Sequence, residues 1–278
     1  AVDELISAYK EAGKDYDELL IAIQRSFLLS NHPSSLASQE ERWKSFKMLR
    51  ATEQKIQENP HQLAYLTRRL EIDLLKPFTL DETNGFRYLE KRIREAKSVF
   101  LRKLYETILE KFHEVASVKV PGFRLKDESG NPQRLFFFQK YAIHEILNRQ
   151  QEALQSARHG HPVKNPGVIL AMEQGLGKTL VALSAIRRNK EGALIVTPHP
   201  IMGIWGEQEG RFFEDRGLVL AEDVSSEEKV RVIDAAGKTP KVVPLQFLQQ
   251  TTYGRFAAMN RYPLQTLVLD ESHFIGNT

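Results

Sequence analysis

Residues Pro166–Leu180 read Pro-Gly-Val-Ile-Leu-Ala-Met-Glu-Gln-Gly-Leu-Gly-Lys-Thr-Leu, and this stretch decides the expected fold of the second half of the chain. Its apolar run, Val168–Ala171, is typical of a fully buried strand. Gly175 and Gly177 follow, and the composition of residues 180–186 is that of a helix. A strand, a glycine turn ending in Gly-Lys-Thr and a helix together predict a phosphate-binding loop. The alternative, a chance glycine turn before a helix, leaves this order of elements unexplained.

Backbone amides are the groups with which such a loop binds phosphate. Glycines free N–H groups, and the N-terminus of the next helix adds more, so the loop holds anionic oxygens. Lys178 would reach the terminal phosphates, and the hydroxyl of Thr179 would hold Mg²⁺. The general pattern has glycine where this chain has Met172. The loop residues expected to bind ATP are Gln174, Gly175, Leu176, Gly177, Lys178, Thr179 and Leu180.

A second motif, Leu267–His273, would complete the site. Its apolar run delivers Asp270 to the carboxyl end of a strand, beside the place of a phosphate-binding loop in a doubly wound sheet. An aspartate there can hold Mg²⁺, partly through water. Glu271 can accept a proton from the water that attacks the γ-phosphate. Acidic residues often end strands, so this motif alone is a weak indication of a nucleotide site. It becomes a stronger one because the chain also contains the phosphate-binding loop. Together they predict an ATPase-type site with Lys178 and Glu271 as catalytic residues.

Apolar strands and helices alternate through the second half of the chain. The helical segments are expected at 135–147, after the loop, and from Ile204-Trp205, while the polar stretch 149–165 is expected to be loop. This alternation predicts a parallel α/β sheet in a domain of residues 134–278. The further strands are expected at 192–198, 218–220, 242–245 and 267–269.

Residues 1–117 are expected to be an all-helical domain, because they are rich in Leu, Glu, Lys, Arg, Gln and Ala and poor in glycine. Residues 118–133 change character and are interpreted as a junction. The domain contains no recognisable chemistry, so we interpret it as an accessory or partner-binding unit. Caps, breakers and apolar spacing place its helices at 3–12, 16–29, 38–58, 61–75 and 86–116.

Basic side chains crowd the last of these helices: Lys91, Arg92, Arg94, Lys97, Arg102 and Lys103. Residues 1–118 hold 19 basic and 19 acidic side chains, and this balance favours a solvated helix face. A stripe that binds nucleic acid is the alternative.

The composition bounds the class of protein. The chain has 278 residues, 41% of them hydrophobic and 27% charged, which is typical of a soluble globular protein of two domains. A net charge of +3 permits a nucleic-acid partner without arguing for one. There are no cysteines, no secretion signal and no apolar run near the ~18 residues of a membrane span, so we expect an intracellular protein, cytoplasmic, nucleoid-associated or nuclear according to its source. His159 and His161 have no further ligands nearby, so a metal site there is not expected.

Several motifs carry a resemblance to a known family. Asp270-Glu271-Ser272-His273 resembles the DEAD/DEAH-type box of superfamily-2 helicases, and Gly175-Leu176-Gly177-Lys178-Thr179 resembles the loop of the Swi/Snf family of DNA-translocating ATPases. In that family a residue other than glycine usually stands at the position of Met172. The distant branch with annealing-helicase-like members is the part of the family that the chain resembles, over residues 134–278. Further similar segments are 135–139, 194–198 with Trp205, 242–248 and 274–277, where Gly276 replaces a lysine.

The resemblance implies a fold class: an all-α N-terminal domain followed by a three-layer α/β, recombinase-like first lobe of a P-loop NTPase, incomplete at its C-terminus. It implies ATP and Mg²⁺ as cofactors, with Gln139 near the adenine. It also implies a DNA-dependent ATP hydrolase that translocates along double-stranded DNA and contacts mainly phosphates. Because the second lobe and its arginine finger are expected outside these residues, this piece alone should bind ATP weakly and hydrolyse little of it. A protein partner is expected for the helical domain, and no membrane.

Two alternatives stay open. The first is a helical interaction or autoinhibitory module attached to a degenerate nucleotide-binding lobe, favoured by the unusual residues Met172, Gln174 and Gly276. The second is another superfamily-2 helicase or a restriction-type translocase, against which Trp205 and the Gly-Leu-Gly loop argue.

Overall fold

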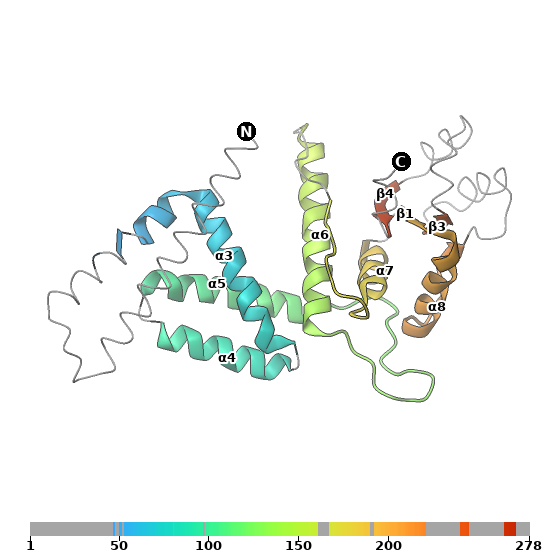
Figure 1. The fold of residues 1–278 in the computed structure, drawn as a ribbon, viewed down its shortest axis with the longest axis horizontal. Coiled ribbons are helices and arrows are strands. Elements are labelled where there is room, and N and C mark those ends of the chain that lie inside the picture. The colour runs from blue at the N-terminus through green and yellow to red at the C-terminus, as the bar shows by residue number, and fades with distance from the viewer. Residues whose placement is uncertain are drawn as a thin grey trace. The chain divides into compact units, whose positions relative to one another are not determined.

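The computed structural model (Figure 1) describes residues 47, 50, 51, 53–79, 81–96, 98–160, 167–189, 192–220, 240–244 and 264–270. The chain divides into two compact units, Ala1–Glu114 and Val115–Thr278. In the described residues the first unit is helical, and the second combines helices with a sheet. The fold is therefore a helical unit followed by an α/β unit, as the sequence predicted at this coarse level.

The helical unit contains α3 (Pro60–Leu75), the short 3-10 helix η1 (Lys76–Phe78), α4 (Glu82–Glu95) and most of α5 (Val99–Ala116). Two helices begin where a side chain caps a free amide. Asn59 accepts from the backbone N–H of His61 and Gln62, and Asp81 accepts from that of Thr83. The predicted helix 61–75 is confirmed, whereas the predicted helices 3–12 and 16–29 lie outside the described residues.

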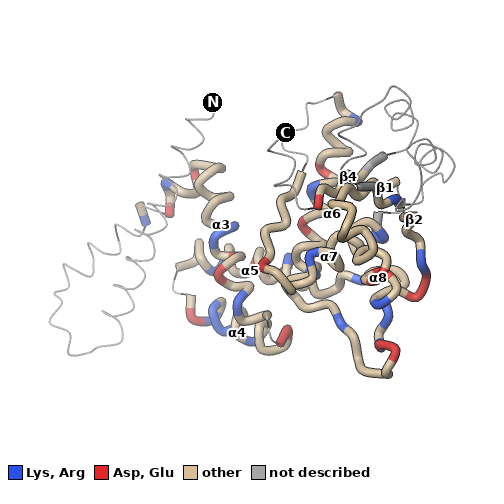
Figure 2. The backbone as a smooth tube through the Cα atoms, turned by 45° about the vertical axis from the view of Figure 1, so that its right-hand side comes forward, with Lys and Arg blue, Asp and Glu red and all other residues tan. Residues whose placement is uncertain are grey.

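Phe78 is buried in the core of this unit. Its ring meets those of Phe86 and Phe112 edge to face, with centroids 5.0 and 4.9 Å apart. Gly85 lets α4 approach this ring, since a Cβ there would lie 2.4 Å from Cγ of Phe78. In Figure 2, lysine, arginine, aspartate and glutamate are all found along these helices.

The single helix predicted over 86–116 is wrong. The chain forms two helices, because Ala96 adopts an extended conformation (φ −64°, ψ 115°) and Ser98 begins a new helix. The hydroxyl of Ser98 accepts from the N–H of Leu101 and donates to the buried carboxylate of Glu53. The apolar stripe continues across the break, which is why spacing alone missed it.

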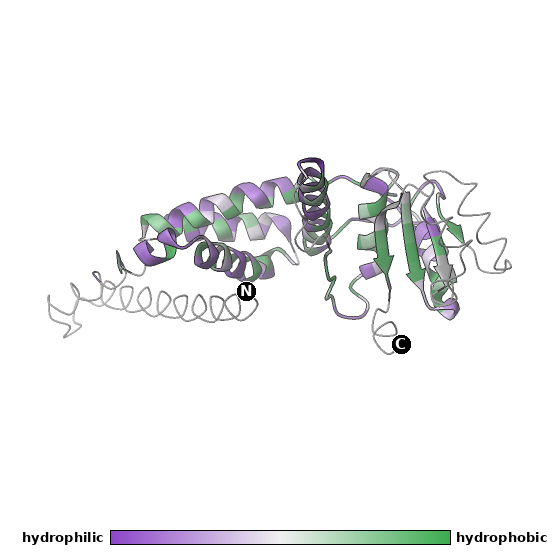
Figure 3. Cartoon of the chain, turned by 90° about the horizontal axis from the view of Figure 1, so that it is seen from above, coloured by the Kyte–Doolittle hydropathy of each residue, from purple (hydrophilic) through white to green (hydrophobic). Residues whose placement is uncertain are grey.

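The α/β unit is built on four parallel strands in the order β2-β3-β1-β4. Their bounds are β1 (Gly192–Thr197), β2 (Val219–Leu220), β3 (Lys241–Pro244) and β4 (Leu264–Leu269). All six residues of β1 are buried, and Figure 3 shows the hydrophobic character of the strands in green. The predicted parallel sheet is confirmed.

The helices of this unit are α6 (Phe137–Arg158), α7 (Lys178–Asn189) and α8 (Met202–Phe212), with the 3-10 helix η2 (His199–Ile201) before α8. The prediction of a loop from residue 149 is wrong, because α6 continues to Arg158 and ends before Gly160 (φ 69°). The run 149–158 is polar, but Arg, Gln, Glu, Ala and Leu are good helix formers. Among the described residues, no helix is both long and apolar enough to cross a membrane.

The predicted strand Val168–Ala171 is also wrong. Residues 167–173 form no strand, and Val168 and Ile169 are 43% and 93% exposed. In the sheet β1 already has β3 and β4 as neighbours, so this segment could join only at an outer edge. In the described residues β4 pairs with β1 alone, and Leu267 and Leu269 are 50% and 43% exposed. An apolar run forms a strand only where a partner strand pairs with it.

Candidate functional site

The glycine loop leads directly into α7. Gly175 and Gly177 have φ of 83° and 86°, a left-handed conformation that favours glycine over residues with a Cβ. The amide of Leu176 donates to the carbonyl of Glu173 at 3.4 Å, so the loop turns between them. Helix α7 then begins at Lys178 and has no acidic residue in its first turn. The loop thus points the uncompensated amino end of a helix outward, which is the arrangement that binds anions.

Lys178 folds back over the loop. Its ammonium donates to the carbonyl oxygens of Met172 at 3.0 Å and Glu173 at 3.3 Å. These bonds hold the amine against the backbone that enters the loop. Thr179, the next residue, is half-buried in the first turn of α7.

Gln139 fixes the loop from α6. Its Nε2 donates to the carbonyl of Leu176 at 3.0 Å, and its Oε1 accepts from the amide of Phe136 at 3.0 Å. Gln139 is buried, and a Cβ on Gly177 would lie 2.7 Å from its Nε2. The residue that the resemblance placed near the adenine therefore contacts the backbone of the loop.

Asp270 follows β4 and is held from two sides. Its Oδ2 accepts from Oγ1 of Thr197 and from Nε1 of Trp205, each at 3.1 Å. Its backbone N–H donates to the carbonyl of Val196 at 2.9 Å. Thr197 and Trp205 are 0% and 2% exposed, so both donors are fixed by the core. In the described part of the chain, Oδ1 of Asp270 has no hydrogen-bond partner.

The loop and Asp270 belong to the same edge of the sheet. Helix α7 runs from the loop to β1 through a short connection, and its side chains Val181, Leu183 and Ile186 share a core cluster with Ile195. A helix that returns beside a parallel strand places its N-terminus near the carboxyl end of that strand. The carboxyl end of β1 is Thr197, the partner of Asp270.

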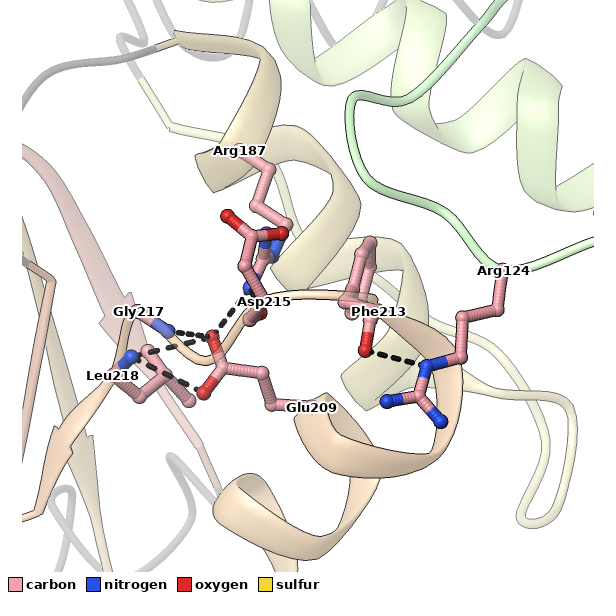
Figure 4. Close-up of polar contacts among 7 residues, drawn as sticks. All are labelled: Arg124, Arg187, Glu209, Phe213, Asp215, Gly217 and Leu218. Atoms are coloured by element: carbon pink, nitrogen blue, oxygen red, sulfur yellow. Dashed lines mark hydrogen bonds and ion pairs between the residues drawn. The ribbon is translucent and has the colours of Figure 1, made fainter. Parts of the chain in front are cut away.

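Arg187 at the far end of α7 anchors this helix to α8 (Figure 4). Its guanidinium donates to Oε1 of Glu209 at 2.7 Å and to Oδ1 of Asp215 at 3.1 Å. It also lies 4.3 Å from the ring centroid of Phe213. The buried carboxylate of Glu209 accepts in addition from the amides of Gly217 and, through both oxygens, Leu218. The network holds the loop helix against the segment that enters β2.

Sequence reasoning identified the loop and Asp270 but missed the part played by Thr197, and it gave Trp205 no contact. A threonine that ends one strand and a tryptophan eight residues later carry no sequence signal that they bond to the same carboxylate. Glu271, Ser272, His273 and His161 lie outside the described residues. No group of three or more His, Cys, Asp or Glu in the described residues could hold a metal ion. Thr179 and Asp270 remain the side chains that could take part in holding one.

The chain matches no known protein-family model, and no curated protein is significantly similar to it.

Proposed function

We propose that the chain binds ATP and Mg²⁺ on the loop 174–180 and is part of a DNA-dependent ATPase that translocates along double-stranded DNA. The observation that carries this proposal is the glycine loop at the N-terminus of α7, at the same edge of the sheet as the clamped carboxylate of Asp270. A loop that presents amides and an ammonium beside a metal-binding carboxylate suits a nucleoside triphosphate with its magnesium ion.

The residues of the loop fit this ligand. The first amides of α7 lack intrahelical acceptors, and no carboxylate lies in its first turn to compete with phosphate. Lys178 would exchange two neutral carbonyl acceptors for phosphate oxygens. Mg²⁺ usually keeps several waters and takes one or two protein ligands beside the phosphates, so Thr179 and Asp270 suffice. Bound there, the ion would neutralise charge on the phosphates.

Each protein group then has a distinct task. Lys178 would orient and neutralise the terminal phosphates, and Asp270 would help to hold the hydrated ion. Glu271, one residue on, is proposed as the base that takes a proton from the attacking water. The DNA part of the proposal rests on the resemblance of the motifs to those of Swi/Snf-type translocases, and its contacts would go mainly to phosphates.

Nucleotide binding is the first test. A fluorescent ATP analogue should bind the chain with Mg²⁺, and Lys178→Ala should weaken binding about 10-fold or more, since a charge-assisted bond to phosphate is lost. Lys126→Ala, an exposed lysine outside the site, is the matched control. Equal binding by Lys178→Ala and the control would contradict a phosphate-binding loop.

Hydrolysis is the second test and needs the whole protein. ATP turnover should rise with duplex DNA, and Glu271→Gln should bind ATP but not hydrolyse it. Turnover that ignores both DNA and Glu271→Gln would contradict the translocase.

An interaction module with a degenerate nucleotide-binding lobe is the second candidate. The observation that favours it is the segment 167–173, which is outside the sheet and exposes Ile169. A binding experiment in which no nucleotide protects this segment from proteolysis would favour this reading over the first.

A further inference from the structure

The helical unit concentrates positive charge in one short segment. Residues 87–103 hold seven basic and two acidic side chains, a net charge of +5, whereas the whole chain carries only +3. The rest of the chain is therefore slightly acidic. A charge this local is not explained by the overall composition.

The basic side chains of this segment lie on both sides of the break between α4 and α5. Arg102, in the first turn of α5, donates to the carbonyl of Ala96 at 3.2 Å, across the end of α4. Arg92 reaches from α4 to the hydroxyl of Tyr105 at 3.5 Å, with its guanidinium 5.9 Å from the ring centroid. The basic end of α4 and the basic start of α5 therefore meet. We call this surface the α4–α5 corner; its members are Arg87, Lys91, Arg92, Arg94, Arg102 and Lys103.

Little acid neutralises the corner. All six of its basic residues are exposed. Lys91 forms a long, exposed ion pair with Glu95 at 3.7 Å, a kind of pair worth little. Within the described residues Arg87, Arg94 and Lys103 form no ion pair. The first turn of α5 contains no acidic residue, so the positive end of its dipole adds to the charge.

We propose that the α4–α5 corner binds the phosphate backbone of duplex DNA. Arg87, Lys91 and Arg94 follow each other at spacings of four and three, so they form one row of about 10 Å along α4. Duplex DNA carries one negative charge per about 1.7 Å of its axis, so a row of this length faces several phosphates. Arginine, the commonest residue of the corner, offers the planar fork of donors that phosphate accepts.

This contact goes beyond the proposed function, because it lies in the helical unit and requires neither ATP nor the loop. It gives the unit a role of its own, which is to hold DNA without reading its sequence. The corner is proposed to contact phosphates and not the edges of bases. Its affinity for duplex DNA should therefore be independent of the DNA sequence and should fall as the salt concentration rises.

The test is DNA binding by the chain without nucleotide. The dissociation constant of a labelled duplex of about 25 base pairs is measured between about 50 and 200 mM salt, the range over which phosphate contacts weaken strongly. The corner variant combines Arg87→Gln, Arg94→Gln and Lys103→Gln. Its matched control, with the same change in charge, combines Lys126→Gln, Arg134→Gln and Arg158→Gln, all exposed residues outside the corner.

The corner variant should bind about 10-fold or more weakly and should lower the slope of log affinity against log salt by about 2 to 3. The control should keep both the affinity and the slope within about a factor of two of the unchanged chain. Equal losses in the two variants, or no loss in either, would overturn the proposal.

Three further measurements exclude misfolding of the variant, binding of an acidic protein and a dependence on the ATP site. The helical circular dichroism of the corner variant should equal that of the unchanged chain; if it falls, Arg94→Glu alone is used, and an unchanged DNA affinity then overturns the proposal. Poly-glutamate should compete poorly with DNA, and a corner that binds poly-glutamate but not DNA would instead dock an acidic protein. Lys178→Ala should leave DNA binding intact, so a failed ATP site and a failed DNA corner are distinguishable.

Discussion

The indole Nε1 of Trp205 donates to Oδ2 of Asp270 at 3.1 Å, and this bond joins the first turn of α8 to the end of β4. Thr197 donates to the same oxygen from the end of β1. Two buried donors on one carboxylate oxygen fix its orientation and leave the other oxygen for a ligand. The structure thus assigns Trp205 a positioning contact in addition to its place in the core.

Trp205→Phe and Thr197→Val each remove one donor while keeping most of the packing volume. We expect ATP binding without Mg²⁺ to stay unchanged, and the gain in affinity on adding Mg²⁺ to fall about 10-fold, because a misoriented carboxylate holds the hydrated ion poorly. Titrating a fluorescent nucleotide with and without Mg²⁺ separates the two effects.

Thr266→Val is the matched control, since it removes the bond from Gln150 to a threonine on the same strand, β4, away from Asp270. A purely structural role for Trp205 and Thr197 would lower thermal stability and leave the Mg²⁺ dependence the same in all three variants.

The two glycines of the loop provide a matched pair. Gly175→Ala should cost about 1–2 kcal/mol, since alanine is strained at a positive φ. Gly177→Ala should cost about 1–2 kcal/mol more than Gly175→Ala, because its Cβ would displace the amide of Gln139 and break the bonds of that amide. At Gly175 no atom lies within 4 Å of the position that a Cβ would take. Urea denaturation gives both values. In a Gln139→Ala background the extra cost should vanish; if it persists, Gln139 does not fix the loop.

Arg187 and Glu209 form a largely buried ion pair in the α/β unit. Glu209→Gln should lower the free energy of unfolding by about 3–5 kcal/mol, because it leaves a guanidinium that is only 13% exposed without its closest anion. Arg188→Met, which removes a neighbouring exposed arginine bonded to the carbonyl of Lys119, should cost about 1 kcal/mol or less. Combining Arg187→Met with Glu209→Met should cost less than the sum of the single changes. Strict additivity would show that the two charges do not interact.

Lys241 makes the stability of the sheet depend on pH. Burial on β3 lowers the pKa of this lysine to about 8, so between about 8 and its usual 10.5 the unfolded chain binds more protons than the folded one. Stability therefore rises with pH through this window, and below it the folded state carries the full cost of a buried charge. From pH 7.5 to 9.5 the chain should gain about 2 kcal/mol relative to Lys241→Met. If the urea midpoints of the two proteins change equally between about pH 7.5 and 9.5, this prediction is contradicted.

The sequence predicted the elements whose signal is local. β1 is a continuous apolar run bounded by Gly192 and Pro198, and α7 follows a glycine turn. Prediction from the sequence failed for the elements that depend on tertiary contacts. The break at Ala96 depends on the buried partner of Ser98, Glu53, which lies 45 residues away in sequence. The apolar run 168–171 has every property of a strand except a partner to pair with.

The candidate site divides in the same way. Residue types and spacing were enough to identify Lys178 and Asp270, because each belongs to a short motif of consecutive residues. The bonds of Gln139 to Leu176 and of Trp205 to Asp270 span 37 and 65 residues, and nothing in the residue types fixes such pairings.

The outer edge of β4 has a consequence for how the protein behaves at high concentration. Its exposed Leu267 and Leu269 stand beside backbone groups that pair with no other strand in the described residues. Such an edge is a template on which a second chain can continue the sheet. The purified chain is therefore expected to self-associate through β4, and a charged substitution such as Leu267→Lys should keep it dispersed in solution.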